Sequence, residues 1–182
     1  TYGPAGLTDY APAYGRKGAI TDDTQMLLFT AEGLILSKIR QEYVQENKVA
    51  IALYHSYLRW LYTQETQLQD QLIIAHGTCS IVDGLLTGHK ELFSQRAPGN
   101  SCLSALKSGK MGTIESPINN SKGCGGVMRI APIGLFYQDA EKAFQIGCEC
   151  AAITHGHPTG YLASGFLAAV ISMIGYSVTL QD

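Results

Sequence analysis

Apolar residues recur at helical spacing in several stretches of the chain, and no stretch of useful length alternates as a β-strand does. The first of these repeats predicts a helix from about Asp22 to about Lys38. The same spacing predicts helices from about Lys48 to Tyr62, from about Ala140 to Ile153, and from near Pro158 to about Ile174. The pattern therefore predicts an all-α domain.

The pattern is weaker between Gln64 and Phe93. Apolar residues from Leu68 to Ala75 allow one helix, and a shorter helix is expected from Ile81 to Leu86. The segment Arg96 to Cys102 then predicts a turn followed by a helix start, with Asn100 as the N-cap.

Three further segments lack a long helical repeat. Residues 1–20 contain prolines, glycines and tyrosines without a period, which predicts an irregular ordered loop that packs over another part of the molecule. The glycine- and asparagine-rich stretch from Ser108 to Gly126 also predicts a loop. An apolar pattern resumes from Val127 to Tyr137, interrupted by Pro132, and Asp139 is the expected N-cap of the helix after it.

The last predicted helix raises the question of a membrane span, because no charged residue occurs from Tyr161 to Val178. Ser164, Gly165, Ser172 and Gly175 make it only moderately apolar, and no basic residues flank it. A helix buried in the middle of an α-helical domain is the simpler interpretation, so no membrane contact is expected.

Composition and charge narrow the class of protein. Among 182 residues, 46% are hydrophobic and 15% charged, as in an ordinary globular domain, and the formal net charge of −2 provides no basic field for nucleic acid. The five cysteines are odd in number and form no Cys-x-x-Cys pair, so neither a disulfide framework nor a zinc ribbon is indicated. Without a signal-peptide pattern, these features favour a reducing, cytoplasmic location.

The two ends of the chain suggest a longer protein. The first residue is Thr1 rather than methionine, and the last apolar helical pattern stops only a few residues before Asp182. We therefore expect residues 1–182 to form one all-α domain that is the N-terminal and central part of a longer domain, incomplete at both ends.

An acidic cluster at the start of the first predicted helix is the strongest candidate for chemistry. Thr21, Asp22, Asp23 and Thr24 place two carboxylates between two hydroxyls. Hard oxygen donors of this kind suit Mg²⁺, Mn²⁺ or Ca²⁺ rather than Zn²⁺. The alternative is that Thr21 is a helix N-cap and that the two aspartates only complement the helix dipole.

The glycine-rich segment from Ser121 to Gly126 is the second candidate. Glycines allow backbone N–H groups to approach a ligand closely, and the helical pattern that follows favours an anion such as a phosphate or diphosphate. The Gly-Lys-Ser/Thr ending of a Walker loop is absent. An ordinary flexible loop is the alternative.

Two histidines and one arginine complete the candidates. His155 and His157 stand before the last predicted helix and could bind a metal, but no third ligand lies nearby in sequence. One of them more plausibly hydrogen-bonds a ligand or caps the helix than binds a metal, and taken as an isolated pair the two histidines favour a structural role. Arg129 is a lone cation in an apolar run and is expected to pair with a carboxylate or to support a loop.

Four segments together resemble the ADP-ribosylglycohydrolase family, which includes the ADP-ribosylhydrolases and the J1 crystallins. In chain order they are Ile20 to Met26, Arg96 to Asn100, Ser121 to Gly134 and Thr154 to Pro158. The resemblance implies an orthogonal multi-helix fold with a binuclear Mg²⁺ (or Mn²⁺) centre. It also implies hydrolysis of the glycosidic bond that joins ADP-ribose to a protein side chain, with an ADP-ribosylated protein or another ADP-ribose conjugate as the substrate. A non-catalytic ADP-ribose-binding or crystallin-like structural relative is the alternative.

The resemblance also implies a role for each matching residue. Thr21, Asp22 and Asp23 would be metal ligands, and Asp22 or Asp23 could also transfer protons. His155 would line the ADP-ribose pocket. The diphosphate and ribose would be held by the loop residues Ser121, Gly123, Cys124, Gly125 and Gly126.

The family's remaining acidic motifs have no counterpart in this sequence. A Gly-Asp motif usually lies in a first helix, which would precede Thr1, and an Asp-x-Asp-Thr motif lies in a later helix, for which nothing after Thr154 is suitable. The chain is thus expected to hold about half of the metal ligands and to be inactive as an isolated segment.

Overall fold

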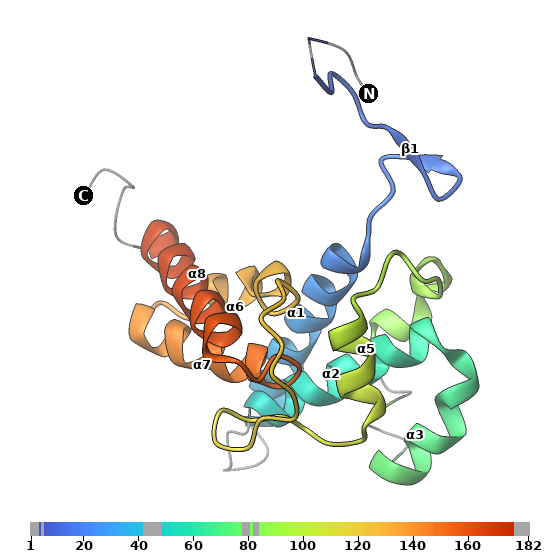
Figure 1. Ribbon diagram of the computed structural model, residues 1–182. Helices are drawn as coiled ribbons and strands as arrows, with labels where there is room; N and C mark the ends of the chain where they lie inside the picture. The colour runs from blue at the N-terminus through green and yellow to red at the C-terminus, as the bar shows by residue number, and fades with distance from the viewer. Residues whose placement is uncertain (1–3, 5, 42–48, 78–80, 82–83, 177–182) are drawn as a thin grey trace.

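The computed structural model describes residues 4, 6–41, 49–77, 81 and 84–176, and in these ranges helices are the main element, with loops between them and almost no strand (Figure 1). The predicted all-α fold is confirmed. In chain order the α-helices are α1 (Asp22–Gln41), α2 (Val49–Gln64), α3 (Gln69–His76), α5 (Asn100–Lys107), α6 (Ala131–Phe136), α7 (Ala140–Ala152) and α8 (Pro158–Tyr176).

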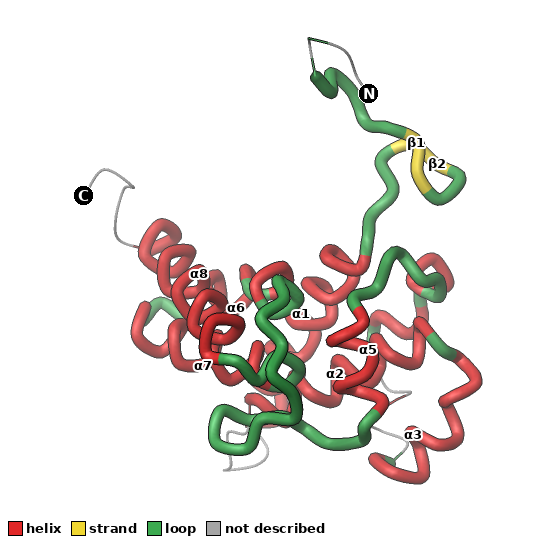
Figure 2. Tube along the Cα trace, viewed as in Figure 1, coloured by secondary structure: helices red, strands yellow, loops and turns green. Residues whose placement is uncertain are grey.

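Shorter elements connect these helices. Two two-residue strands, β1 (Pro12–Ala13) and β2 (Arg16–Lys17), pair antiparallel near the start of the chain, and Figure 2 shows this hairpin set apart from the helices. The single-turn 3₁₀ helices are η1 (Thr66–Leu68), η2 (Leu86–Gly88), η3 (Lys90–Leu92) and η4 (Val127–Arg129).

The strongly periodic helices lie where the apolar pattern predicts them, and α3 follows the weaker repeat near Leu72. Asp139 is confirmed as the N-cap of α7, because its side chain accepts the Lys142 N–H at 3.0 Å. Pro132 lies in the first turn of α6, where no N–H is needed. Of the short helix expected over residues 81–86, positions 82 and 83 lie outside the described residues.

The prediction that Asn100 is an N-cap is wrong. Asn100 is the first residue of α5, Gly99 occupies the cap position, and no side chain caps this helix. Gly99 is extended, with φ −67° and ψ 130°, and its N–H donates to Asp22 Oδ2 at 3.2 Å. A contact with α1, remote in sequence, therefore determines where α5 begins.

The core lies between α1 and α2 and extends to η4 and α7. Tyr57 and Trp60 on α2 are fully buried. Their polar ends have partners, since the Tyr57 hydroxyl lies 2.7 Å from Thr30 Oγ1 and Trp60 Nε1 donates to Gln25 Oε1 at 3.3 Å. Large aromatic area is thus buried without leaving these polar groups unsatisfied.

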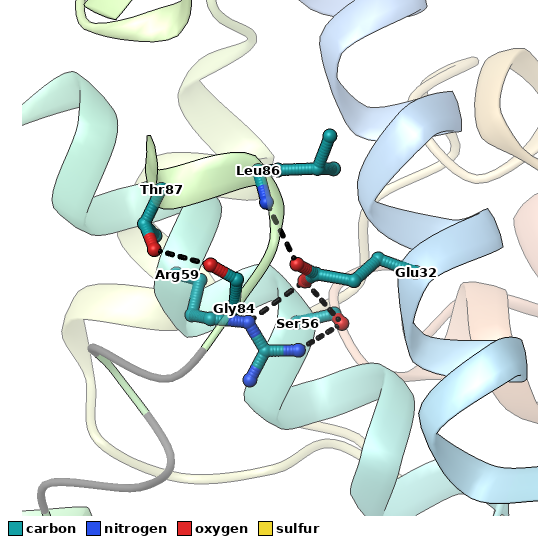
Figure 3. Close-up of polar contacts among 6 residues, drawn as sticks. All are labelled: Glu32, Ser56, Arg59, Gly84, Leu86 and Thr87. Carbon is teal, nitrogen blue, oxygen red and sulfur yellow. Dashed lines mark hydrogen bonds and ion pairs between the residues drawn. The ribbon is translucent and has the colours of Figure 1, made fainter. Parts of the chain in front are cut away.

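A buried ion pair joins α1 to α2 (Figure 3). Arg59 Nε lies 2.7 Å from Glu32 Oε2, and the two side chains are 1% and 3% exposed. Glu32 also accepts hydrogen bonds from Ser56 Oγ at 3.1 Å and from the Leu86 N–H at 3.1 Å. A Cβ at Gly84 would lie 2.5 Å from Arg59 Cδ, so only glycine allows this segment to cover the pair.

The expectation that the N-terminal loop packs over the molecule is wrong for most of its length. Its hairpin projects away from the helices (Figures 1 and 2), and Tyr10 is 74% exposed. Arg96 contacts the loop at two points: its guanidinium lies 5.0 Å from the centre of the ring of Tyr14, in the hairpin turn, and its Nη1 donates to Ile20 O, at the end of the loop, at 3.4 Å. The strands of the hairpin are themselves exposed and pair only with each other.

The expectation that α8 is buried in the middle of the domain is wrong. It packs against α6 and α7 through small residues, and a Cβ at Gly147 of α7 would lie 3.0 Å from the Gly165 Cα of α8. The larger side chains face outward, and Phe166 is 66% exposed. By length and composition α8 is also apolar enough to cross a membrane, and 28% of its apolar window is buried. Three of the small residues that weaken its apolar pattern, Ser164, Gly165 and Ser172, are buried in its packing face.

Candidate functional site

The acidic cluster lies where α1 begins. Thr21 immediately precedes the helix, and its hydroxyl donates to Asp23 Oδ2 at 2.8 Å. The Asp22 N–H donates to Arg96 O at 2.9 Å, and the Asp22 carboxylate accepts the Gly99 N–H. Thr21 therefore has the N-cap position that one interpretation predicted, while its side chain orients a carboxylate.

The two carboxylates differ in environment, since Asp22 is buried and Asp23 is exposed. Burial is the largest influence on Asp22 and raises its pKa; the hydrogen bond from Gly99 opposes this rise, and the charge of Asp23 adds to it. A cation bound here would compensate both the burial and the repulsion. The donors of Thr21, Asp22 and Asp23 are all oxygens, which fits a hard divalent ion.

A cavity of about 300 Å³ opens beside these carboxylates. Its volume is at the lower end of the usual range for ligand pockets. Each of the four segments singled out in the sequence contributes to its wall. The lining residues are Asp22, Asp23, Ala97, Gly99, Asn100, Ser101, Cys102, Gly123, Cys124, Gly125, Met128 and His155.

The glycine-rich segment has two faces. Gly123, Cys124 and Gly125 line the cavity, whereas Gly126 packs on α7 and α8, where an added Cβ would lie 2.7 Å from Ala151 Cβ. Ser121 and Thr21 are not among the residues that line the cavity. The Ser121 hydroxyl lies 2.9 Å from that of Ser101, which links the segment to the start of α5. The binding and metal roles predicted for these residues stay predictions.

Asn119, which the sequence analysis did not single out, holds the glycine-rich segment against the histidine segment. Its Nδ2 donates to Thr154 O at 2.9 Å, and its Oδ1 accepts the N–H groups of Ser121 and Gly156 at 3.0 and 3.1 Å. A Cβ at Gly156 would lie 2.3 Å from Asn119 O. Asparagine commonly stabilises turns through such bonds, so its place before Ser121 was the available signal.

Arg129 is fully buried behind the cavity. Its Nη2 donates to Cys150 O at 2.9 Å and to Thr154 Oγ1 at 2.8 Å, and its guanidinium lies 4.2 Å from the centre of the Tyr57 ring. Within the described ranges it has no ion pair with a carboxylate. Of the two roles predicted for Arg129, support of a loop is confirmed and pairing with a carboxylate is wrong, because carbonyl, hydroxyl and aromatic groups surround the charge.

The two histidines have separate surroundings. His155 is 1% exposed, and its Nδ1 lies 2.9 Å from Thr154 Oγ1. Burial, with a smaller effect of the Arg129 charge, lowers the pKa of His155 to about 4. His157 Nδ1 accepts the Thr159 N–H at 3.0 Å at the start of α8, which is the capping role predicted for one of the pair. Across the described residues, no three His, Cys, Asp or Glu side chains gather as a metal-binding group.

Acidification is expected to destabilise the fold through His155. Its pKa is about 4 in the folded chain and 6.5 ordinarily, so the unfolded chain takes up a proton first. The stability contributed by neutral His155 is present above about pH 6.5 and is lost as the pH falls toward about 4, at a total cost of up to about 3 kcal/mol. Denaturant unfolding across this window measures the change.

His155→Asn is expected to reduce by about one the number of protons taken up on unfolding across this window. Equal pH slopes for wild type and His155→Asn would contradict the assignment.

The sequence model described as ADP-ribosylglycohydrolase matches residues 1–179. The chain belongs to the ADP-ribosylglycohydrolase family. Membership indicates a hydrolase of the glycohydrolase type, with substrates that contain ADP-ribose. No solved structure matches this chain.

Proposed function

We propose that this protein is a metal-dependent hydrolase that cleaves the glycosidic bond between ADP-ribose and a protein side chain, in a reducing, cytoplasmic setting. The observation that carries the proposal is the convergence of four separate segments on one cavity. Two carboxylates, a glycine-rich segment and a buried histidine all line it. Carboxylates suit a cation, and the backbone N–H groups of a glycine-rich segment suit an anion.

The proposed ligand extends from the glycines to the carboxylates. Gly123 and Gly125 have no side chains, so their backbone can approach a diphosphate closely. The first turn of α5, which starts at Asn100 and lines the cavity, presents further N–H groups whose dipoles favour negative charge. The ribose next to the scissile bond then faces Asp22 and Asp23.

The metal proposal concerns the start of α1. The family resemblance implies a centre of two Mg²⁺ or Mn²⁺ ions. One side of this centre would be held by Thr21, Asp22 and Asp23. Bound there, divalent ions supply charge stabilisation for the oxygens of the reacting sugar and an activated water. The chain itself supplies a buried carboxylate, Asp22, fixed by the Gly99 N–H, and an exposed carboxylate, Asp23, oriented by Thr21.

The proposed reaction is a hydrolysis. A water oxygen forms a bond to the anomeric carbon of the ribose, and the bond from that carbon to the side chain breaks, with its electron pair leaving on nitrogen or oxygen. The leaving side chain gains a proton, and the water loses one. Asp22 and Asp23 border the place where this exchange occurs, so either carboxylate can hold the proton between the two steps, although a metal-bound carboxylate is the weaker base.

Calorimetry and an activity assay test the proposal together. ADP-ribose is expected to bind in the presence of Mg²⁺ and to bind more weakly after chelation. The full-length protein is expected to release ADP-ribose from arginine-linked or serine-linked peptides only with the metal. Binding without release would support a non-catalytic ADP-ribose-binding protein, and no binding at all would support a structural, crystallin-like relative.

A further inference from the structure

We propose that Arg129 and Thr154 are positioning residues that hold His155 as a neutral imidazole with its proton on Nε2, so that this N–H donates a hydrogen bond to an oxygen of the ligand. The inference rests on the proposed function for the identity of that ligand, ADP-ribose. The direction of the hydrogen bonds rests on the geometry of the buried cluster alone.

The direction follows from the hydroxyl of Thr154. A hydroxyl has one proton to donate and two lone pairs that accept. Arg129 has only donors, and its Nη2 lies 2.8 Å from Thr154 Oγ1, so one lone pair of the hydroxyl is occupied. His155 Nδ1 lies 2.9 Å from the same oxygen. The Cys102 thiol also hydrogen-bonds Thr154, and its sulfur accepts from Arg129 Nη1 at 3.9 Å, so its S–H is directed at the second lone pair of the hydroxyl. The hydroxyl proton is then left for Nδ1, which therefore accepts.

The opposite arrangement is electrostatically unfavourable. A proton on Nδ1 would direct the positive end of a second donor at an oxygen that Arg129 already contacts. Arg129 cannot withdraw, because its Nη2 is also bonded to Cys150 O at 2.9 Å and its guanidinium stacks on the Tyr57 ring. The proton of a neutral His155 is thus placed on Nε2.

The Nε2 edge of His155 faces the glycine-rich wall of the cavity. A Cβ at Gly123 would lie 3.4 Å from Nε2, and one at Gly125 would lie 2.9 Å from it. Both glycines and His155 line the cavity, and Nε2 has no hydrogen-bond partner in the part of the chain that the structure describes. An N–H at this position adds a donor beside the backbone of the glycine-rich segment, which suits a phosphate or ribose oxygen.

The groups around the cavity keep the ring neutral. Arg129 lies behind it, and burial lowers the pKa of His155 to about 4. The Cys102 thiol beside it is neutral because burial raises its pKa. Asp22, Asp23 and the exposed Cys124 face the same cavity without a hydrogen bond to the ring. At neutral pH His155 is therefore neither a cationic acid nor a base at Nε2, and the proton transfers of the reaction belong to the carboxylates.

Nitrogen-15 NMR of the imidazole measures the tautomer directly, without ligand. We expect Nε2 to be protonated and Nδ1 to be unprotonated in the wild type near neutral pH. Thr154→Val removes the hydroxyl and is expected to shift the ring toward a mixture of tautomers, whereas Thr154→Ser keeps the wild-type signal. A wild-type ring protonated on Nδ1 would overturn the proposal, and this result does not depend on whether the valine variant folds.

Titration with ADP-ribose tests the functional part. Thr154→Val is expected to weaken binding about tenfold, the effect of one hydrogen bond, and Thr154→Ser is expected to restore it. Unchanged affinity and tautomer in Thr154→Val would refute the positioning role. If the wild type has the expected tautomer and binds no ADP-ribose, the proposed function fails while the assignment of the proton stands.

Discussion

Replacing Glu32 with alanine is expected to lower the free energy of unfolding by about 3–5 kcal/mol. Arg59 would remain 1% exposed while losing the carboxylate that it contacts at 2.7 Å. Ser56 Oγ and the Leu86 N–H would lose their acceptor at the same time. Glu32 lies on α1, and its donors come from α2 and from the segment after Gly84, so the substitution would weaken the contacts among these three parts of the fold. Denaturant unfolding measures the change in the free energy of unfolding.

Two comparisons separate the buried charge from an ordinary loss of contacts. Glu65→Ala breaks the ion pair with Lys107, whose side chain is 41% exposed, and is expected to cost no more than about 1 kcal/mol. Changing both Glu32 and Arg59 to methionine removes the two charges together and is expected to recover much of the stability lost in Glu32→Ala. An effect of Glu32→Ala no larger than that of Glu65→Ala would contradict the assigned role.

The sequence predicts helices well where the apolar repeat is long, as in α1, α2 and α7. The prediction is less successful where tertiary contacts decide. Helix α8 has small residues on its buried face, so its largest apolar side chains point outward and the repeat does not identify the packing side. At Asn100, a good capping residue is displaced by one position, because Gly99 is held by Asp22, 77 residues earlier in the chain.

The candidate site is predictable in part for a related reason. Carboxylates and glycines can be recognised by residue type, and Asp22, Gly123 and His155 do line one cavity. The supporting contacts cannot be recognised in this way. Arg129 reaches Thr154 only because η4 packs against α1 and α8, and nothing in the letters around it distinguishes a carboxylate partner from a hydroxyl.

Asp22→Asn is expected to abolish metal-dependent hydrolysis, by more than about a hundredfold, without destabilising the metal-free protein. Asparagine keeps the shape of the side chain and an oxygen that can accept the Gly99 N–H. It removes a charge that burial makes unfavourable, since burial raises the pKa of Asp22, and it ends the repulsion with Asp23. The ionised carboxylate lowers stability as the pH rises through its raised pKa, so the metal-free variant is expected to unfold at a higher temperature than wild type at neutral pH.

The response to Mg²⁺ then separates a binding site from a helix cap. If Mg²⁺ binds the folded wild type, a concentration of about 100 times its Kd raises the free energy of unfolding by about 2.7 kcal/mol. The same concentration is expected to raise the free energy of unfolding of Asp22→Asn much less. Asp70→Asn is the matched control, because Asp70 is also an acidic residue in the first turn of a helix, α3, and does not line the cavity. It should respond to Mg²⁺ as wild type does. If Asp22→Asn lost stability without metal and wild type gained none from Mg²⁺, the carboxylate would act only by stabilising the N-terminus of α1. A carboxylate that lowers the stability of the metal-free protein is instead explained by a cation that binds it.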